Sequence, residues 1–203
     1  MSRFHGKQQK RAQFIRTPNV RAAPKKIDAD HLRQQYQNKV NQAQGQHFED
    51  LIDAGCEYYR LRGIADIEKT PEPLRPVQDM GGGLFLARYT KKGQTDYKGC
   101  IRGGQAIYLE AKYTDTGRMQ QDRVTENQTK RLDRAQSLGA LAFVLCSFGA
   151  VGFYRIPWPI WKTLKQLFGH KYITPQEAAP FEVRIGGPGV LLFLEGIEKE
   201  ENL

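Results

Sequence analysis

The sequence predicts a mixed β-sheet flanked by helices, an α/β or α+β arrangement around one hydrophobic core. The chain has 203 residues, of which 39% are hydrophobic and 26% charged, enough for one domain with a core and too few for two full-sized domains. Helix-like and strand-like segments alternate along it. Residues 140–148 form an almost continuous apolar run, which is typical of a strand buried on both faces.

The first predicted element is an amphipathic helix from Gly45 to about Gly63. Small and apolar residues recur there at spacings of three and four, as one helix face requires: Phe48, Leu51, Ile52, Gly55, Tyr58 and Tyr59. The next 27 residues, 69–95, contain three prolines and a glycine triplet at 81–83. Since this is too long for an ordinary loop, we expect an insertion that projects from the domain.

A β-hairpin is predicted next, with strands at 96–101 and 106–113 around an Arg-Gly-Gly-Gln turn. If the loop has three residues, paired positions sum to 206 and Asp96 lies opposite Glu110; a bulge or a two-residue loop would break this pairing. The remaining expected elements are a polar helix ended by Gly139, a buried strand with its hairpin partner, a short helix and an extended segment, at residues 120–138, 140–148, 151–156, 158–168 and 190–194.

The positive charge is concentrated at the N-terminus. Residues 1–40 contain ten Lys/Arg and two Asp, a net charge of +8, and the other 163 residues carry only +1. This segment is also poor in aliphatic residues, so we predict a flexible basic arm at 1–40. Such an arm gains affinity for polyanions by counterion release, which favours nucleic acid as the partner, then acidic lipid. The alternative is a solubilising tail.

Several protein classes lose support. No apolar stretch approaches the roughly 20 residues of a membrane helix, and the basic N-terminus is unlike a secretory signal, so we expect a cytoplasmic protein without membrane contact. Cys56, Cys100 and Cys146 have neither disulfide-framework nor zinc spacing. Phosphate-loop, Rossmann and Gly-x-Ser-x-Gly signatures are absent.

The residues with candidate chemistry lie on the hairpin. Side chains alternate along a strand, so Glu110 and Lys112 face one side and Ala111 the other. With Asp96 opposite, two carboxylates lie beside an ammonium, a set that can hold Mg²⁺ and support phosphodiester hydrolysis. The alternative is an exposed cross-strand salt bridge, worth less than about 1 kcal/mol.

Five short segments in order resemble the RecU family of Holliday junction resolvases, in the PD-(D/E)xK nuclease superfamily. They are Gly-Gln-His-Phe-Glu at 45–49, Glu-Lys-Thr-Pro-Glu-Pro at 68–73, Thr-Asp-Tyr-Lys-Gly at 95–99, Tyr-Leu-Glu-Ala-Lys at 108–112 and Asn-Gln at 127–128. The resemblance covers about residues 45–161. It implies a restriction-endonuclease-like mixed sheet with a projecting stalk.

The resemblance also implies residue roles. Asp96, Glu110 and Gln128 match metal ligands, Lys112 matches the catalytic lysine, and Glu49 matches a catalytic acid on the first helix. Two positions depart from the family, which has histidine in place of Asn127 and threonine in place of Gln94. A register shift would let Thr95 replace that threonine.

The implied function is that of a Mg²⁺-dependent endonuclease, with Mn²⁺ as a substitute, that resolves four-way DNA junctions as a homodimer in recombination and repair. Recombination proteins are possible further partners. The arm (1–40) would precede a nuclease domain (41–203) with its stalk at about 71–95. The arm, the stalk and Lys69 just before the stalk supply the predicted DNA-binding residues: Arg3, Lys7, Lys10, Arg11, Arg16, Lys25, Lys26, Lys69, Arg75 and Arg88.

Two alternatives stay open. One is a nuclease of the same superfamily with another DNA specificity, for example a phage or mobile-element enzyme acting on ends or flaps. The other is a non-catalytic protein that binds branched DNA through its arm.

Overall fold

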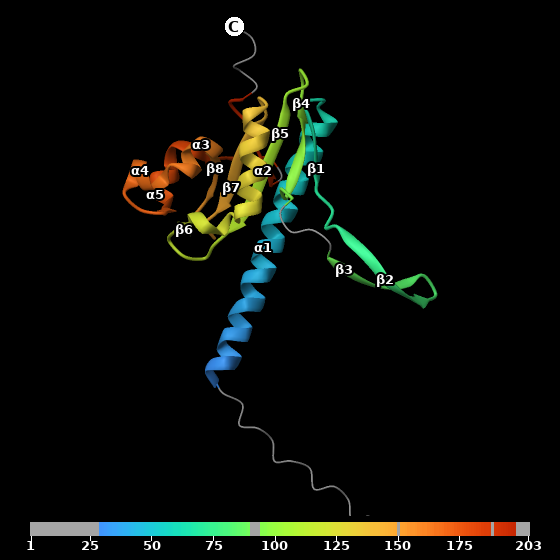
Figure 1. The fold of residues 1–203 in the computed structure, drawn as a ribbon. Helices are drawn as coiled ribbons and strands as arrows, with labels where there is room; N and C mark the ends of the chain where they lie inside the picture. Colours follow the sequence, from blue (N-terminus) through green and yellow to red (C-terminus); the bar gives the residue numbers. More distant parts are fainter. Residues whose placement is uncertain (1–28, 90–93, 150, 188, 198–203) are drawn as a thin grey trace, which may run out of the picture.

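A six-stranded mixed sheet forms the centre of the molecule (Figure 1). The structure is a computed structural model and describes residues 29–89, 94–149, 151–187 and 189–197. The strands lie in the order β1 (Ala65–Lys69), β4 (Tyr97–Ile101), β5 (Ala106–Tyr113), β7 (Leu141–Ser147), β8 (Phe153–Pro157) and β10 (Glu182–Val183). Only β5 and β7 are parallel, and α2 (Glu126–Ser137) lies between them in the chain. The predicted mixed sheet flanked by helices is confirmed.

Each face of the sheet carries its own hydrophobic core. Helix α1 (Ala29–Leu61) covers one face, and α2, α3 (Trp158–Lys162) and α4 (Leu164–Phe168) cover the other. On β7, Phe143 and Leu145 belong to the α1 core, while Val144 and Cys146 belong to the opposite core. This alternation explains the continuous apolar run, because both faces of β7 are buried.

Helix α1 is longer than the sequence predicts. It has 33 residues, about 50 Å at the usual rise, and starts at Ala29 rather than Gly45. Residues 29–40, which we assigned to the arm, are therefore helical; residues 1–28 lie outside the described chain. The segment lacks an apolar stripe, but Ala, Gln and Arg are helix-compatible residues that extend an already packed helix. Figure 1 shows this half of α1 running well past the sheet.

Within its packed half, α1 makes a close approach at Gly55. A Cβ atom there would lie 2.7 Å from the carbonyl oxygen of Leu191 and 2.8 Å from the ring of Phe193. The glycine predicted for the apolar stripe is therefore where the C-terminal segment crosses the helix.

The predicted projection is a two-stranded hairpin of β2 (Leu74–Gly81) and β3 (Leu84–Tyr89). It extends away from the sheet in Figure 1, and every residue in both strands is exposed. Positive φ angles of 79°, 64° and 81° at residues 81–83 form its turn, which explains the glycine triplet. We call residues 74–89 the stalk.

The predicted hairpin register is also confirmed. Strands β4 and β5 pair Tyr97 with Leu109 and Cys100 with Ala106, positions that sum to 206 around a three-residue loop. The predicted polar helix is instead a 3₁₀ turn, η1 (Gln121–Arg123), followed by α2. The helix expected at 158–168 is divided at Thr163 into α3 and α4.

The C-terminal segment is less regular than predicted. Of the extended segment at 190–194, only β12 (Val190–Leu191) is a strand, paired with β11 (Ile185–Gly186). Strand β1 was not predicted from the sequence, nor were the short elements β6 (Met119–Gln120), β9 (Tyr172–Ile173), α5 (Pro175–Ala178) and η2 (Ala179–Phe181). Among the described residues, no helix is long and apolar enough to span a membrane.

Candidate active site

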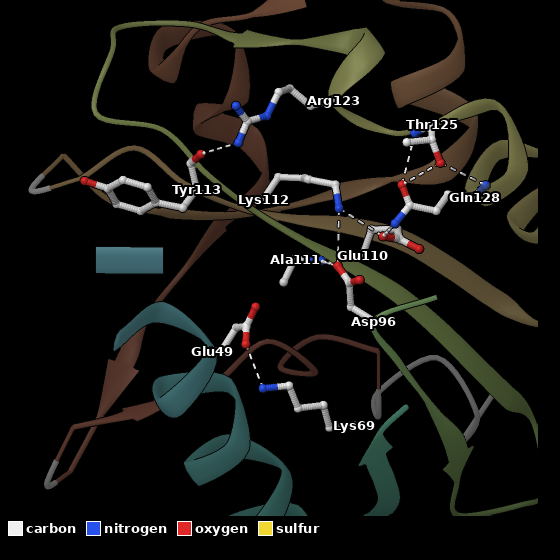
Figure 2. A network of polar contacts seen from close by, with 10 residues as sticks. All are labelled: Glu49, Lys69, Asp96, Glu110, Ala111, Lys112, Tyr113, Arg123, Thr125 and Gln128. Atoms are coloured by element: carbon white, nitrogen blue, oxygen red, sulfur yellow. Dashed lines mark hydrogen bonds and ion pairs between the residues drawn. The ribbon is translucent and has the colours of Figure 1, made fainter. Parts of the chain in front are cut away.

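Four of the predicted site residues converge at one end of the central strands (Figure 2). Asp96 immediately precedes β4, Glu110 and Lys112 lie on β5, and Gln128 lies in the first turn of α2. Ala111 packs with the α1 core, so strand alternation directs Glu110 and Lys112 toward the face that α2 covers. The fold thus brings together residues 32 positions apart.

Asp96 reaches this cluster by a different route from the predicted one. Strand pairing stops at Tyr97 and Leu109, one position short of Asp96, which lies in a bend. Its Oδ2 accepts a hydrogen bond from the backbone N–H of Ala111 at 2.9 Å. The Asp96 carboxylate therefore takes the place of a backbone acceptor at this position, and it is directed toward Lys112.

Lys112 is held between the two carboxylates. Its Nζ lies 3.3 Å from Asp96 Oδ2 and 3.0 Å from Glu110 Oε2, with 12% of the side chain exposed. Burial alone would lower the pKa of Lys112, but the neighbouring carboxyl groups, Asp96 first and then Glu110, outweigh it and raise the pKa. The ammonium is consequently charged and fixed in place. The exposed salt bridge considered from sequence does not describe this triad, in which Glu110 is buried and Lys112 nearly so.

Glu110 is fully buried, with no exposed side-chain surface. Burial, followed by the neighbouring charge of Asp96, raises the pKa of Glu110 to about 8 against the opposing effect of Lys112. Its Oε2 accepts from Lys112 and from Gln128, whereas Oε1 has no hydrogen-bond partner among the described residues. A buried carboxylate oxygen without a partner is costly, and a cation would satisfy it.

Gln128 links the cluster to the start of α2. Its Nε2 donates to Glu110 Oε2, and its Oε1 accepts from both the backbone N–H and the hydroxyl of Thr125, each at 3.0 Å. Thr125 in turn accepts from the Gln128 backbone N–H, which completes a capping box. Sequence reasoning missed Thr125, although the Thr-x-x-Gln spacing before a helix is the signal for such a box.

Glu49 lies on α1, outside this cluster. It forms an ion pair with Lys69 at 2.7 Å, and with Lys112 it lines a groove of about 260 Å³. Lys69, predicted as a DNA contact, is therefore paired with an acid. The nearby Tyr97 hydroxyl donates to Asp53 at 2.8 Å, fixing β4 against α1.

The other predicted residues are spread over the surface. Arg75 and Arg88 are paired cross-strand neighbours on the stalk, and the seven arm residues, from Arg3 to Lys26, lie outside the described chain. Thr95 is buried and Gln94 half-buried. Within the described residues, neither side chain hydrogen-bonds to Asp96, so the proposed replacement of the family threonine stays a prediction.

Comparison with known proteins identifies the family. Residues 43–199 match RecU, described as recombination protein U, a match over more than half of the chain. The chain belongs to the RecU family. This RecU-family chain is 33% identical over 125 residues to Holliday junction resolvase RecU of Lactococcus lactis subsp. lactis (strain IL1403), covering 56% of each chain. It is 30% identical over 125 residues to Holliday junction resolvase RecU of Streptococcus gordonii (strain Challis), covering 57% of this chain and 60% of the relative.

The matched stretch thus spans less than two thirds of each of these relatives. Among solved structures, Hjc from Archaeoglobus fulgidus, a Holliday junction resolvase from an archaeal hyperthermophile, superposes with a TM-score of 0.38 and 14% identity. That superposition covers 67% of this chain and 93% of Hjc.

Proposed function

We propose that this protein is a divalent-cation-dependent endonuclease, with Mg²⁺ as the cation, that cleaves four-way DNA junctions. The observation that supports it most strongly is a fixed lysine between two carboxylates, one of which has a buried oxygen without a partner among the described residues. Membership of the RecU family supports the same conclusion.

The residues at the site fit a hard cation. Asp96 and Glu110 Oε1 would supply carboxylate oxygens, which Mg²⁺ prefers. The described residues contain no group of three or more His, Cys, Asp or Glu side chains suited to a metal. Two carboxylates nevertheless suffice for Mg²⁺, because it usually retains several waters and also binds substrate phosphate. The bound cation would orient the scissile phosphate and lower the pKa of the attacking water.

The protein residues then have distinct tasks. Lys112, oriented by Asp96 and Glu110, donates hydrogen bonds to the attacking water or to the phosphate oxygens as negative charge develops. Glu49 lies across the groove from Lys112, where it would orient water. The stalk arginines and the N-terminal arm would hold the DNA backbone.

Cleavage of a labelled four-way junction tests this proposal. With Mg²⁺ we expect paired cuts near the branch, none in EDTA, and little cutting of a linear duplex of the same sequence. Asp96→Asn and Lys112→Ala should abolish cutting and leave junction binding nearly intact. Lys130→Ala, which removes an exposed lysine on α2, is the matched control and should cut normally.

The possible outcomes separate the alternatives. Tight junction binding without cleavage under any divalent cation would favour a non-catalytic DNA-binding protein. Cleavage of flaps or ends in preference to junctions would favour a nuclease of other specificity. Wild-type rates in Lys112→Ala would contradict the assigned site.

We also propose that the active form is a homodimer. A four-way junction cut on paired strands suits two equivalent sites related by a two-fold axis. Sedimentation equilibrium of the full chain should give twice the 23.2 kDa of one copy. A monomer that still makes paired cuts in one binding event would contradict this.

A further inference from the structure

The groove beside Lys112 contains a cation that the proposed reaction does not use. Its walls come from α1 and from the end of β5 with the turn that follows, and Arg123 of η1 completes it. At about 260 Å³ it is smaller than the roughly 300–1,000 Å³ of ordinary small-molecule pockets. Figure 2 shows the Arg123 guanidinium at the backbone of Tyr113, the residue that follows Lys112 on β5.

Arg123 is anchored but not neutralised. Its side chain is exposed, and one guanidinium nitrogen donates to the carbonyl oxygen of Tyr113 at 3.2 Å. Over the described residues, no carboxylate lies within ion-pair distance of it. This anchor fixes the direction of the guanidinium and leaves its other N–H groups available.

The two acids that line the same groove do not form an ion pair with Arg123. Glu49 pairs with Lys69 at 2.7 Å, and Asp115 accepts from Gln37 at 3.1 Å. Lys112 is fixed by Asp96 and Glu110, and its remaining hydrogen-bond donor is assigned to the proposed reaction. Arg123 is therefore the groove cation whose charge remains available to a ligand.

We infer that Arg123 binds a phosphate of the cleaved DNA strand next to the scissile phosphate. A planar guanidinium with several free N–H groups matches the geometry of a phosphodiester. Because Arg123 and Lys112 line one groove, a strand whose phosphate reaches Lys112 would continue past Arg123. This inference rests on the proposed function and adds to it the path of the strand. Sequence reasoning did not select Arg123.

The salt dependence of DNA binding tests the inference. Full-length wild type, Arg123→Ala, Arg123→Lys and Arg134→Ala would be titrated with a four-way junction in EDTA over a range of salt concentrations. Each phosphate contact contributes about 0.9 to the slope of log affinity against log salt. Arg123→Ala should make this negative slope shallower by about 0.9 and weaken binding roughly five- to tenfold at 0.1 M salt. Arg134 is exposed on α2 and lies outside the groove. Arg134→Ala is therefore the matched control and should change neither the slope nor the affinity.

Arg123→Lys separates charge from structure. It keeps the charge, so the slope should equal the wild-type value. Because lysine cannot form the bidentate hydrogen bonds of a guanidinium, the affinity for DNA should stay below that of wild type. A purely structural role would lower the melting temperature without changing the slope. An unchanged slope in Arg123→Ala would overturn the inference. Failure of wild type to cleave in Mg²⁺ would instead count against the proposed function, because the binding measurement needs no cleavage.

Discussion

The charge state of the Glu110 carboxyl group depends strongly on its surroundings. Its pKa is raised from 4.5 to about 8, first by burial and then by Asp96. In the cation-free protein the folded state therefore keeps a proton that the unfolded chain loses above about pH 4.5. The stability associated with this proton is fully present at low pH and declines as the pH rises toward 8.

Glu110→Gln should remove this pH dependence. We expect the free energy of unfolding of wild type in EDTA to fall between pH 5 and pH 8 by a few kcal/mol, and that of Glu110→Gln to fall distinctly less. Urea denaturation at three pH values measures both. Glu68→Gln, which removes an exposed carboxyl on β1, is the control and should follow wild type. Parallel curves for wild type and Glu110→Gln would show that Glu110 is not protonated at neutral pH.

Thr125 connects the candidate site to the N-terminal end of helix α2. Its side chain caps α2 and holds the amide of Gln128, which donates to Glu110. Thr125→Ala should cost about 1 kcal/mol of stability and also weaken Mn²⁺ binding, because the amide loses its constraint. Urea denaturation and calorimetric Mn²⁺ titration measure the two effects, and Thr125→Ser should restore both.

A second capping box supplies the control for this prediction. Thr174 and Glu177 cap α5 by the same hydrogen bonds, and neither lies in the cluster around Glu110. Thr174→Ala should lower stability and leave Mn²⁺ affinity unchanged. Equal Mn²⁺ affinities in the two variants would mean that the Thr125 cap does not position Glu110.

The stalk is an element that the sheet does not need for its stability. All residues of β2 and β3 are exposed, and the ends of the insertion meet where the Thr70 N–H donates to the Asp96 carbonyl at 2.8 Å. Replacing residues 72–92 by a short glycine linker should therefore leave the melting temperature nearly unchanged. We expect cleavage to lose its preference for junctions over linear duplex. A deletion variant that keeps this preference would show that the stalk does not contribute to junction recognition.

The elements that the sequence predicted are those with strong local signals. The turn glycines at 103–104 fixed the register of β4 and β5, and an apolar run marked β7. Strand β1 was missed because, among its five residues, only Ala65 and Ile67 are buried, too short a pattern to recognise. The extension of α1 was missed because it depends on helix propensity and on the packed turns beyond it, and no apolar stripe marks it.

The candidate site was predictable in composition but not in geometry. Glu110 and Lys112 share a strand face, so their proximity follows from alternation alone. The position of Asp96 depends on a bend and a hydrogen bond to Ala111, which strand pairing does not reveal. Arg123 belongs to the turn before α2, and its contact with the Tyr113 carbonyl depends on how that turn packs against β5. The Thr125 side chain contacts Gln128 three residues on, so its Thr-x-x-Gln spacing could have revealed it.

In the whole molecule, the excess positive charge and the residues that surround Lys112 lie in different parts of the chain. Residues 1–28 contain eight Lys/Arg and one Asp, a net charge of +7 out of the total of +9. Asp96, Glu110, Lys112 and Gln128 all lie beyond residue 95. Binding of the DNA backbone and cleavage should therefore be separable, since long-range attraction depends on net charge and cleavage on the local cluster.

Removal of residues 1–28 tests this separation. If all eight basic residues contact phosphates, the slope of log affinity against log salt should decrease by up to about 7, as measured by fluorescence anisotropy on a labelled junction. The cleavage rate at saturating DNA should stay close to wild type, because no residue of the proposed site is removed. A full-length variant with those eight residues replaced by glutamine should behave like the truncation, since the cause is charge and not length. If the slope stays at the wild-type value, the arm does not bind the DNA backbone. Residues 29–203, with a net charge of only +2, would then hold the junction through local contacts such as Arg75, Arg88 and Arg123.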